Sequence, residues 1–150
     1  MTDKRDGRIL GRHREMHIVP LDTIRNLGPT GPCADQMVLI EDEWPDGVPV
    51  CADTIQRAQG LGLDLHWFAT FFLQNPAWAQ YARVRAAAQD KYEQARAAAR
   101  AMYVHVGHAN SAKLNQVIFT AWAEYQQAFL VALLAAVIQQ LDEEGVRNGL

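Results

Sequence analysis

The chain has 150 residues, of which 49% are hydrophobic, 9% aromatic and 21% charged, a composition that excludes the intrinsically disordered class. The formal net charge of −3 at pH 7 excludes the global basic excess of many nucleic-acid-binding and membrane-surface proteins. Any such role must therefore depend on a local surface.

Cysteine content and hydropathy predict a soluble cytoplasmic protein. Cys33 and Cys51 form neither a disulfide framework nor a CxxC pair, and no apolar segment with a cleavage site follows the N-terminus. The longest uninterrupted apolar run, from Ala128 to Ile138, is shorter than the about 20 residues that a membrane span needs. We therefore expect no membrane association.

Residues 1–19 are predicted to form a flexible basic arm. They carry five Lys or Arg against three Asp or Glu, and Gly7 and Gly11 interrupt any hydrophobic period. Two interpretations remain open, a solvated tail or an arm that contacts nucleic-acid phosphates.

Residues 20–75 are predicted to form an acidic helical head. They contain eight Asp or Glu against two Arg. Capping and turn residues divide the segment into four short helices, expected over residues 22–27, 34–44, 52–59 and 64–73. Its aromatic side chains are expected to form a core rather than a ligand pocket, and they are Trp44, Trp67, Phe68, Phe71 and Phe72.

One acidic run in this head is a candidate binding surface. Glu41, Asp42 and Glu43 follow one another near the end of the second predicted helix. Such a run is either a carboxylate site or, more simply, a solvated helix face.

Residues 76–150 are predicted to form a long Ala-rich helical repeat region. Asn75-Pro76 is typical of a helix start, and an 11-residue period then places Tyr81, Tyr92 and Tyr103 in register. The many alanines favour helix and allow close approach of another helix. A solvated single helix is the simpler alternative.

Gly107 to Ser111 is expected to be the tip of an antiparallel helical hairpin, because a stop-type glycine precedes two capping-type residues. One long continuous helix is the alternative, since the 11-residue phase continues across this segment. The second arm carries a broad apolar stripe that includes Trp122, Tyr125 and Phe129. The predicted fold is therefore all-α, a small four-helix head followed by a long hairpin or single helix that forms a homo-oligomer.

An ordered set of short motifs resembles a known group of proteins. The motifs are Arg25 to Gly28, Cys33-Ala34, Trp44 to Gly47, Leu61 to Trp67 and the repeat unit AWAQYARVRAA from Ala77. In this combination the chain resembles uncharacterised bacteriophage and prophage proteins with a small helical N-terminal part and tandem Tyr-centred, Ala-rich repeats. The resemblance implies a viral origin, and with it an accessory or counter-defence role; the expected location is then the host cytoplasm.

The sequence lacks the motifs of catalysis. It contains no nucleophile elbow, no HExxH, no Gly-rich phosphate loop and no Cys/His spacing typical of zinc. His105 and His108 alone do not make a metal site. We expect no enzyme activity, no metal and no cofactor.

The leading hypothesis is therefore a non-enzymatic inhibitor of a host defence machine, such as a CRISPR-type effector, which acts by covering a protein surface. One alternative is an oligomeric sponge for a small anionic nucleotide, held by Arg83, Arg85, Arg96 and Arg100. Another is a virion or scaffolding protein. The candidate interface residues are these four arginines with Tyr81, Tyr92, Tyr103, Trp122, Tyr125 and Phe129, and the acidic run of the head.

Overall fold

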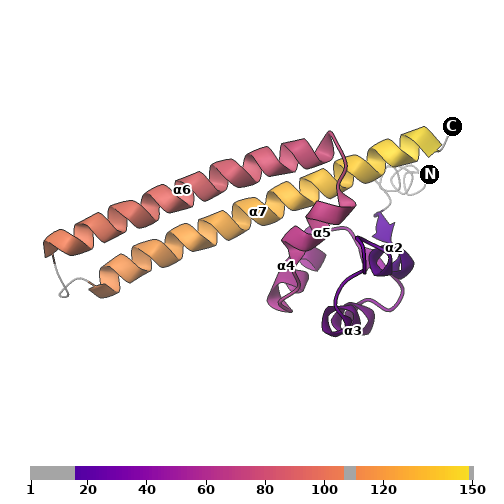
Figure 1. The fold of residues 1–150 in the computed structure, drawn as a ribbon, viewed down its shortest axis with the longest axis horizontal. Helices are drawn as coiled ribbons and strands as arrows, with labels where there is room; N and C mark the ends of the chain where they lie inside the picture. Colours follow the sequence, from indigo (N-terminus) through magenta and orange to yellow (C-terminus); the bar gives the residue numbers. More distant parts are fainter. Residues whose placement is uncertain (1–15, 107–110, 149–150) are drawn as a thin grey trace, which may run out of the picture. The chain divides into compact units, whose positions relative to one another are not determined.

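Helices make up most of the described chain, so the predicted all-α class is confirmed (Figure 1). The computed structural model describes residues 16–106 and 111–148. The predicted basic arm lies outside these residues except for its last four. The chain divides into two units at Leu65 and His66, and each unit is described by itself.

Residues 16–64, the described part of the first unit before α5, combine three short helices with a minimal sheet. Its elements are β1 (Ile18–Val19), α2 (Leu21–Arg25), α3 (Ala34–Glu43), β2 (Val48–Pro49) and α4 (Ala52–Gly60). β1 and β2 are antiparallel, with Val19 opposite Val48, and the Val50 amide donates to the His17 carbonyl at 2.9 Å. The pairing stays short because Pro49 has no N–H to donate.

Glycines with a positive φ allow the turns of this unit, and at Gly31 and Gly47 a Cβ would also clash with its surroundings. Gly31 has a φ of 75°, and a Cβ there would lie 2.3 Å from the carbonyl oxygen of Arg25. Gly47 has a φ of 109°, and its Cβ would lie 2.7 Å from Cγ2 of Ile18. Only glycine adopts these conformations without strain, so the turn positions are set by the backbone rather than by side-chain packing.

The second unit contains α5 (Leu65–Phe72) from its second residue onward, together with α6 (Ala77–Val106) and α7 (Ser111–Asn148). α6 and α7 lie side by side (Figure 1). They run antiparallel, since Tyr81 contacts Phe129 whereas Tyr92, further along α6, contacts Trp122, further back on α7. Residues 107–110 of the predicted tip lie outside the described part of the chain.

The described structure places α5 with the long helices, although the sequence assigns residues 64–73 to the head. The reason is a contact across 68 residues, which sequence patterns do not show. Gln140 on α7 is 6% exposed; its amide donates to the Phe72 carbonyl at 2.8 Å and its oxygen accepts from the Gln74 N–H at 2.6 Å. The division between the units therefore falls before the predicted boundary at Asn75.

The aromatic side chains of α5 differ from the expected core. Phe72 is buried, but Phe71 is 42% exposed, and Trp67 and Phe68 are half-buried. A helix of eight residues packed on one side cannot bury aromatic groups that face several directions.

Within residues 16–106 and 111–148, one segment, Ala112–Val146 of α7, is long and apolar enough to cross a membrane by length and composition, with a mean hydropathy of 1.4. A core helix of a water-soluble protein passes the same test. The absence of membrane association therefore stays a prediction.

Candidate binding surface on the paired helices

Five aromatic side chains form a continuous row along the seam between α6 and α7. In order they are Tyr81, Phe129, Tyr125, Tyr92 and Trp122, with successive ring centroids 5.9, 6.4, 6.1 and 5.3 Å apart. We call this the aromatic row. All five belong to the interface residues proposed from the sequence, so the structure brings these together.

The inner end of the aromatic row is part of the core. Tyr81 is 1% exposed, and its hydroxyl lies 3.0 Å from Nδ1 of His66. Its ring also lies 5.6 Å from that of Trp78. A ring this enclosed stabilises the helix pair and is closed to a partner.

The outer end of the aromatic row is open to solvent. Trp122 is 42% exposed, and Phe119, one turn earlier on α7, is 69% exposed. Aromatic side chains are enriched at protein interfaces, and Trp is among the residues that contribute most to the binding energy there. Sequence analysis places Phe119 in the apolar stripe of the second arm but counts only Trp122 among the candidate interface residues, although the three-residue spacing places the two on neighbouring positions of one helix side.

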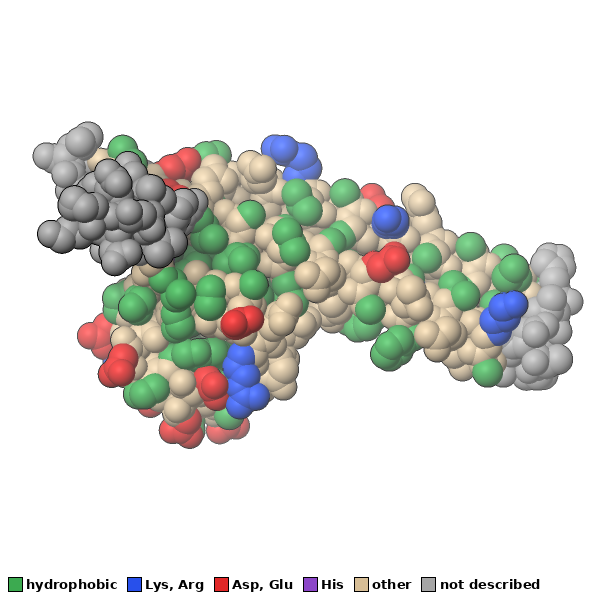
Figure 2. All heavy atoms as spheres, turned by 180° about the vertical axis from the view of Figure 1, so that it is seen from behind, with side chains coloured by type: hydrophobic (Ala, Val, Ile, Leu, Met, Phe, Trp, Pro, Cys, Tyr) green, Lys and Arg blue, Asp and Glu red, His purple; other side chains and the backbone are tan. Residues whose placement is uncertain are grey.

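The four candidate arginines do not gather at one point. At about 100° per residue, Arg85, Arg96 and Arg100 follow one side of α6 over about 22 Å, whereas Arg83 points to another side. Arg96 donates to Glu93 at 3.2 Å. Figure 2 likewise shows Lys and Arg as separate patches on the visible face. No single pocket that holds one phosphate group results from this arrangement.

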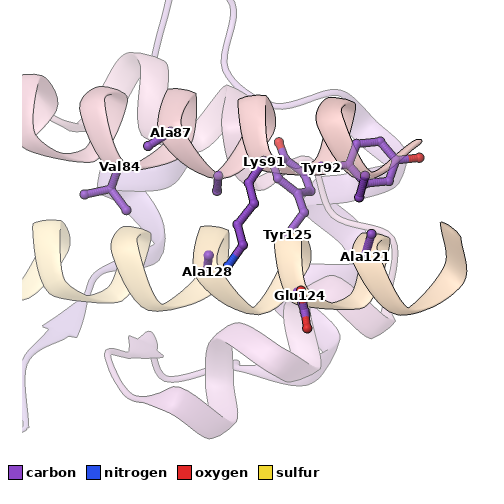
Figure 3. Close-up of a pocket in the computed structure, with 10 residues that line it drawn as sticks. Val84, Ala87, Lys91, Tyr92, Ala121, Glu124, Tyr125 and Ala128 are labelled. Atoms are coloured by element: carbon purple, nitrogen blue, oxygen red, sulfur yellow. The ribbon is translucent and has the colours of Figure 1, made fainter. Parts of the chain in front are cut away.

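A groove of about 340 Å³ lies between α6 and α7, beside the aromatic row (Figure 3). Small side chains form much of its wall, and Lys91 and Glu124 lie at its border. The lining residues are Val84, Ala87, Ala88, Lys91, Tyr92, Ala95, Ala121, Glu124, Tyr125 and Ala128. Sequence analysis missed this groove.

The acidic run of the head does not form a convergent carboxylate site. Glu41 accepts from Arg25 at 2.7 Å and Glu43 accepts from Arg57 at 3.1 Å, so the two carboxylates turn to different partners. These hydrogen bonds raise the pKa of both arginines, against some desolvation. Asp42 is exposed.

Metal ligation finds no support among residues 16–106 and 111–148. These residues contain no group of three or more His, Cys, Asp or Glu side chains that could hold a metal ion. The side chains of Tyr103, His105 and His108 lie outside the described part of the structure.

Comparison with protein-family models, with curated proteins and with solved structures gave no match. The geometry of the helix pair is therefore the basis for a functional proposal.

Proposed function

We propose that the protein is a non-enzymatic binding protein that contacts a protein partner through the outer end of the aromatic row. The observation that carries the proposal is the exposure of Phe119 and Trp122, at 69% and 42%, on a pair of packed helices. Burial of such side chains in a partner is strongly favourable, and two rotatable side-chain bonds make their ordering inexpensive in entropy.

The neighbouring charges define the chemistry of the partner. Arg96 and Arg100 lie on the side of α6 that borders Trp122, by the turn of about 100° per residue. Arginine recognises carboxylates through paired hydrogen bonds. The surface therefore fits an apolar pocket with carboxylates at its rim.

A host defence machine, such as a CRISPR-type effector, is the partner that we propose. The resemblance to phage proteins supports this choice. The first unit supports it too, because the segment from Asp22 to Asp64 contains eight carboxylates and only two arginines. Both arginines form ion pairs with glutamates of α3. An acidic unit of this kind would compete with nucleic acid for a basic groove.

The proposal includes a homo-oligomeric arm. α7 exposes apolar side chains on more than one side, among them Val117, Phe119 and Val131. A single neighbouring helix cannot cover them all, and helices that are apolar nearly all round are usually buried in an assembly. The acidic head and the hairpin-like arm would then be repeated in each copy.

The test is a pull-down of the tagged chain from bacteria with mass spectrometry of the bound proteins. Wild type should retain a host complex in stoichiometric amount, and the variant Phe119→Ser/Trp122→Ser should lose it. Val104→Ser is the matched control, since Val104 is 79% exposed on the same helix pair but points away from the seam. Equal retention by wild type and the double variant would reject this binding surface.

A second candidate, a sponge for a small anionic nucleotide, is favoured by one observation. Nε of the half-buried Arg85 is buried and has no hydrogen-bond partner among the described residues. A buried donor without a partner is costly, and an anion would satisfy it. A thermal-shift screen against cyclic nucleotides should then show stabilisation that Arg85→Gln removes; no shift with any nucleotide would reject the sponge.

A further inference from the structure

Two rows of exposed side chains with seven-residue spacing border the groove between α6 and α7. The rows are Val84, Lys91 and Ala98 on α6 and Val117, Glu124 and Val131 on α7. All six residues are exposed. Seven residues are about two helical turns, so each row follows one side of its helix.

The two rows are level with each other. Tyr92 follows Lys91 and Tyr125 follows Glu124, and the two tyrosine rings are 6.1 Å apart, so Lys91 and Glu124 lie at the same height along the pair. Because the helices are antiparallel, one heptad in either direction places Val84 level with Val131 and Ala98 level with Val117.

Lys91 and Glu124 form no ion pair with each other or with another described residue. In Figure 3, Lys91 reaches toward Ala128, whereas Glu124 lies on the side of α7 that faces away from α6. The two opposite charges therefore lie at one level beside the groove without pairing with each other.

We propose that a second copy of this chain covers the groove, related by a two-fold axis parallel to the helices, in a four-helix bundle where Lys91 of each copy pairs with Glu124 of the other. The inference rests on the oligomeric arm of the proposed function. With this axis, α6 of each copy lies over α7 of the other and runs antiparallel to it. Each residue of one row then meets its level partner, so the valines Val84 and Val131 also meet.

The charges select this axis over the alternative. A two-fold axis perpendicular to the helices would place α6 on α6, with Lys91 over Lys91 and Glu124 over Glu124. Like charges in direct opposition disfavour that arrangement. The exposed rows are therefore complementary in charge when the two-fold axis is parallel to the helices, and not when it is perpendicular to them.

The available area suits a stable dimer. α6 has 30 residues and is about 45 Å long. Two helices about 9 Å apart present a face about 18 Å wide, which corresponds to about 800 Å² on each copy. Specific protein interfaces of standard size bury about this area per partner.

The experiment measures the mass of the full-length protein by light scattering and the pairing of differently tagged copies by native mass spectrometry. Wild type should be a dimer. Lys91→Glu alone and Glu124→Lys alone each create two like-charge contacts across the interface and should weaken self-association at least about tenfold. A mixture of the two single variants should form a heterodimer, since every contact then joins opposite charges. Asp90→Lys, on the outward side of α6, is the charge-reversal control and should remain a dimer.

A monomeric wild type, or single variants that dimerise as well as wild type, would overturn the proposal. A mixture of the two single variants that forms no heterodimer would also overturn it. Mixing restores opposite charges only if residues 91 and 124 pair between two copies and not within one chain. If wild type is a monomer that floats with phosphatidylcholine vesicles, lipid covers the groove and the proposal is also overturned. None of these results depends on Phe119 or Trp122, so failure here is distinguishable from failure of the partner-binding surface.

Discussion

The two units of the chain are stabilised in different ways. The first, up to Leu65, depends on turns that only glycine allows, on two residue pairs between short strands and on a small set of buried apolar side chains such as Ile24 and Ile40. The second, from His66, depends on aromatic rings and small side chains along the seam of two long helices. Its buried alanines include Ala77, Ala99, Ala121, Ala132 and Ala136.

The difference teaches where binding surfaces can be placed. The paired helices gain their stability at the inner end of the aromatic row, so the outer end and the groove can remain exposed without loss of the fold. The first unit is small and needs its apolar side chains for its own core, and its surface is acidic. We therefore expect substitutions to have large effects on stability inside the seam and small effects on the acidic surface.

The largest effect is expected for Tyr81→Ala. The side chain is 1% exposed and contacts Phe129 and Trp78, so its removal leaves a cavity in the seam. A loss of about 3–5 kcal/mol in the free energy of unfolding follows for an aromatic side chain of this kind. Urea denaturation followed by circular dichroism measures it.

Tyr81→Phe is the matched control, because it removes only the hydroxyl that contacts His66 and should cost about 1 kcal/mol. Equal losses in the two variants would show that the hydroxyl, not the ring, stabilises the seam.

A somewhat smaller loss is expected for Gln140→Leu. This substitution leaves the Phe72 carbonyl and the Gln74 N–H without their side-chain partner near α5. About 2–4 kcal/mol should be lost for two backbone groups. Gln139→Leu, next to it on α7, is the control; hydrogen exchange in residues 66–76 should rise in the first variant and stay unchanged in the second.

In the first unit, Gly31→Ala should cost about 1–3 kcal/mol, because the φ of 75° and the nearby Arg25 carbonyl both exclude a Cβ. Gly60→Ala is the control, since nothing lies within 4 Å of a Cβ at that position. Hydrogen exchange should increase in residues 20–50 and remain as in wild type in α6. An undisturbed first unit would contradict the role given to this turn.

The smallest effect is expected for Arg57→Gln. Its hydrogen bond to Glu43 raises the pKa of Arg57, so the stabilisation is present below the ordinary arginine pKa and is lost only when the pH rises through the still higher folded pKa. Arg57 is therefore charged throughout the neutral range, and this pair predicts no pH dependence there. The melting temperatures of wild type and variant should nearly agree, both at pH 6 and at pH 8. A large difference between the two proteins would show that this exposed ion pair contributes substantially to stability.

Local signals predicted much of the helical structure. Gly28, which directly follows the helix expected over residues 22–27, has a φ of 67°, and the helix expected over residues 52–59 is observed at Ala52–Gly60. Capping and turn preferences act over a few residues and can be read directly. The in-register Tyr81 and Tyr92 both face α7, as a helical period requires.

Non-local contacts could not be predicted in the same way. The placement of α5 depends on Gln140, and the groove depends on the height at which Tyr92 meets Tyr125. Neither contact can be predicted from the residues near it in the sequence. The heptad spacing of Val117, Glu124 and Val131 was visible in the sequence, but its meaning required the partner row on α6.

The most direct test of the partner-binding surface is hydroxyl-radical footprinting of the protein alone and in its captured host complex, with oxidation read by mass spectrometry at Phe119, Trp122 and Val104. Binding through the outer end of the aromatic row predicts that oxidation of Phe119 and Trp122 falls strongly in the complex while that of Val104 is unchanged. Equal oxidation of Phe119 and Trp122 in the two samples would contradict it.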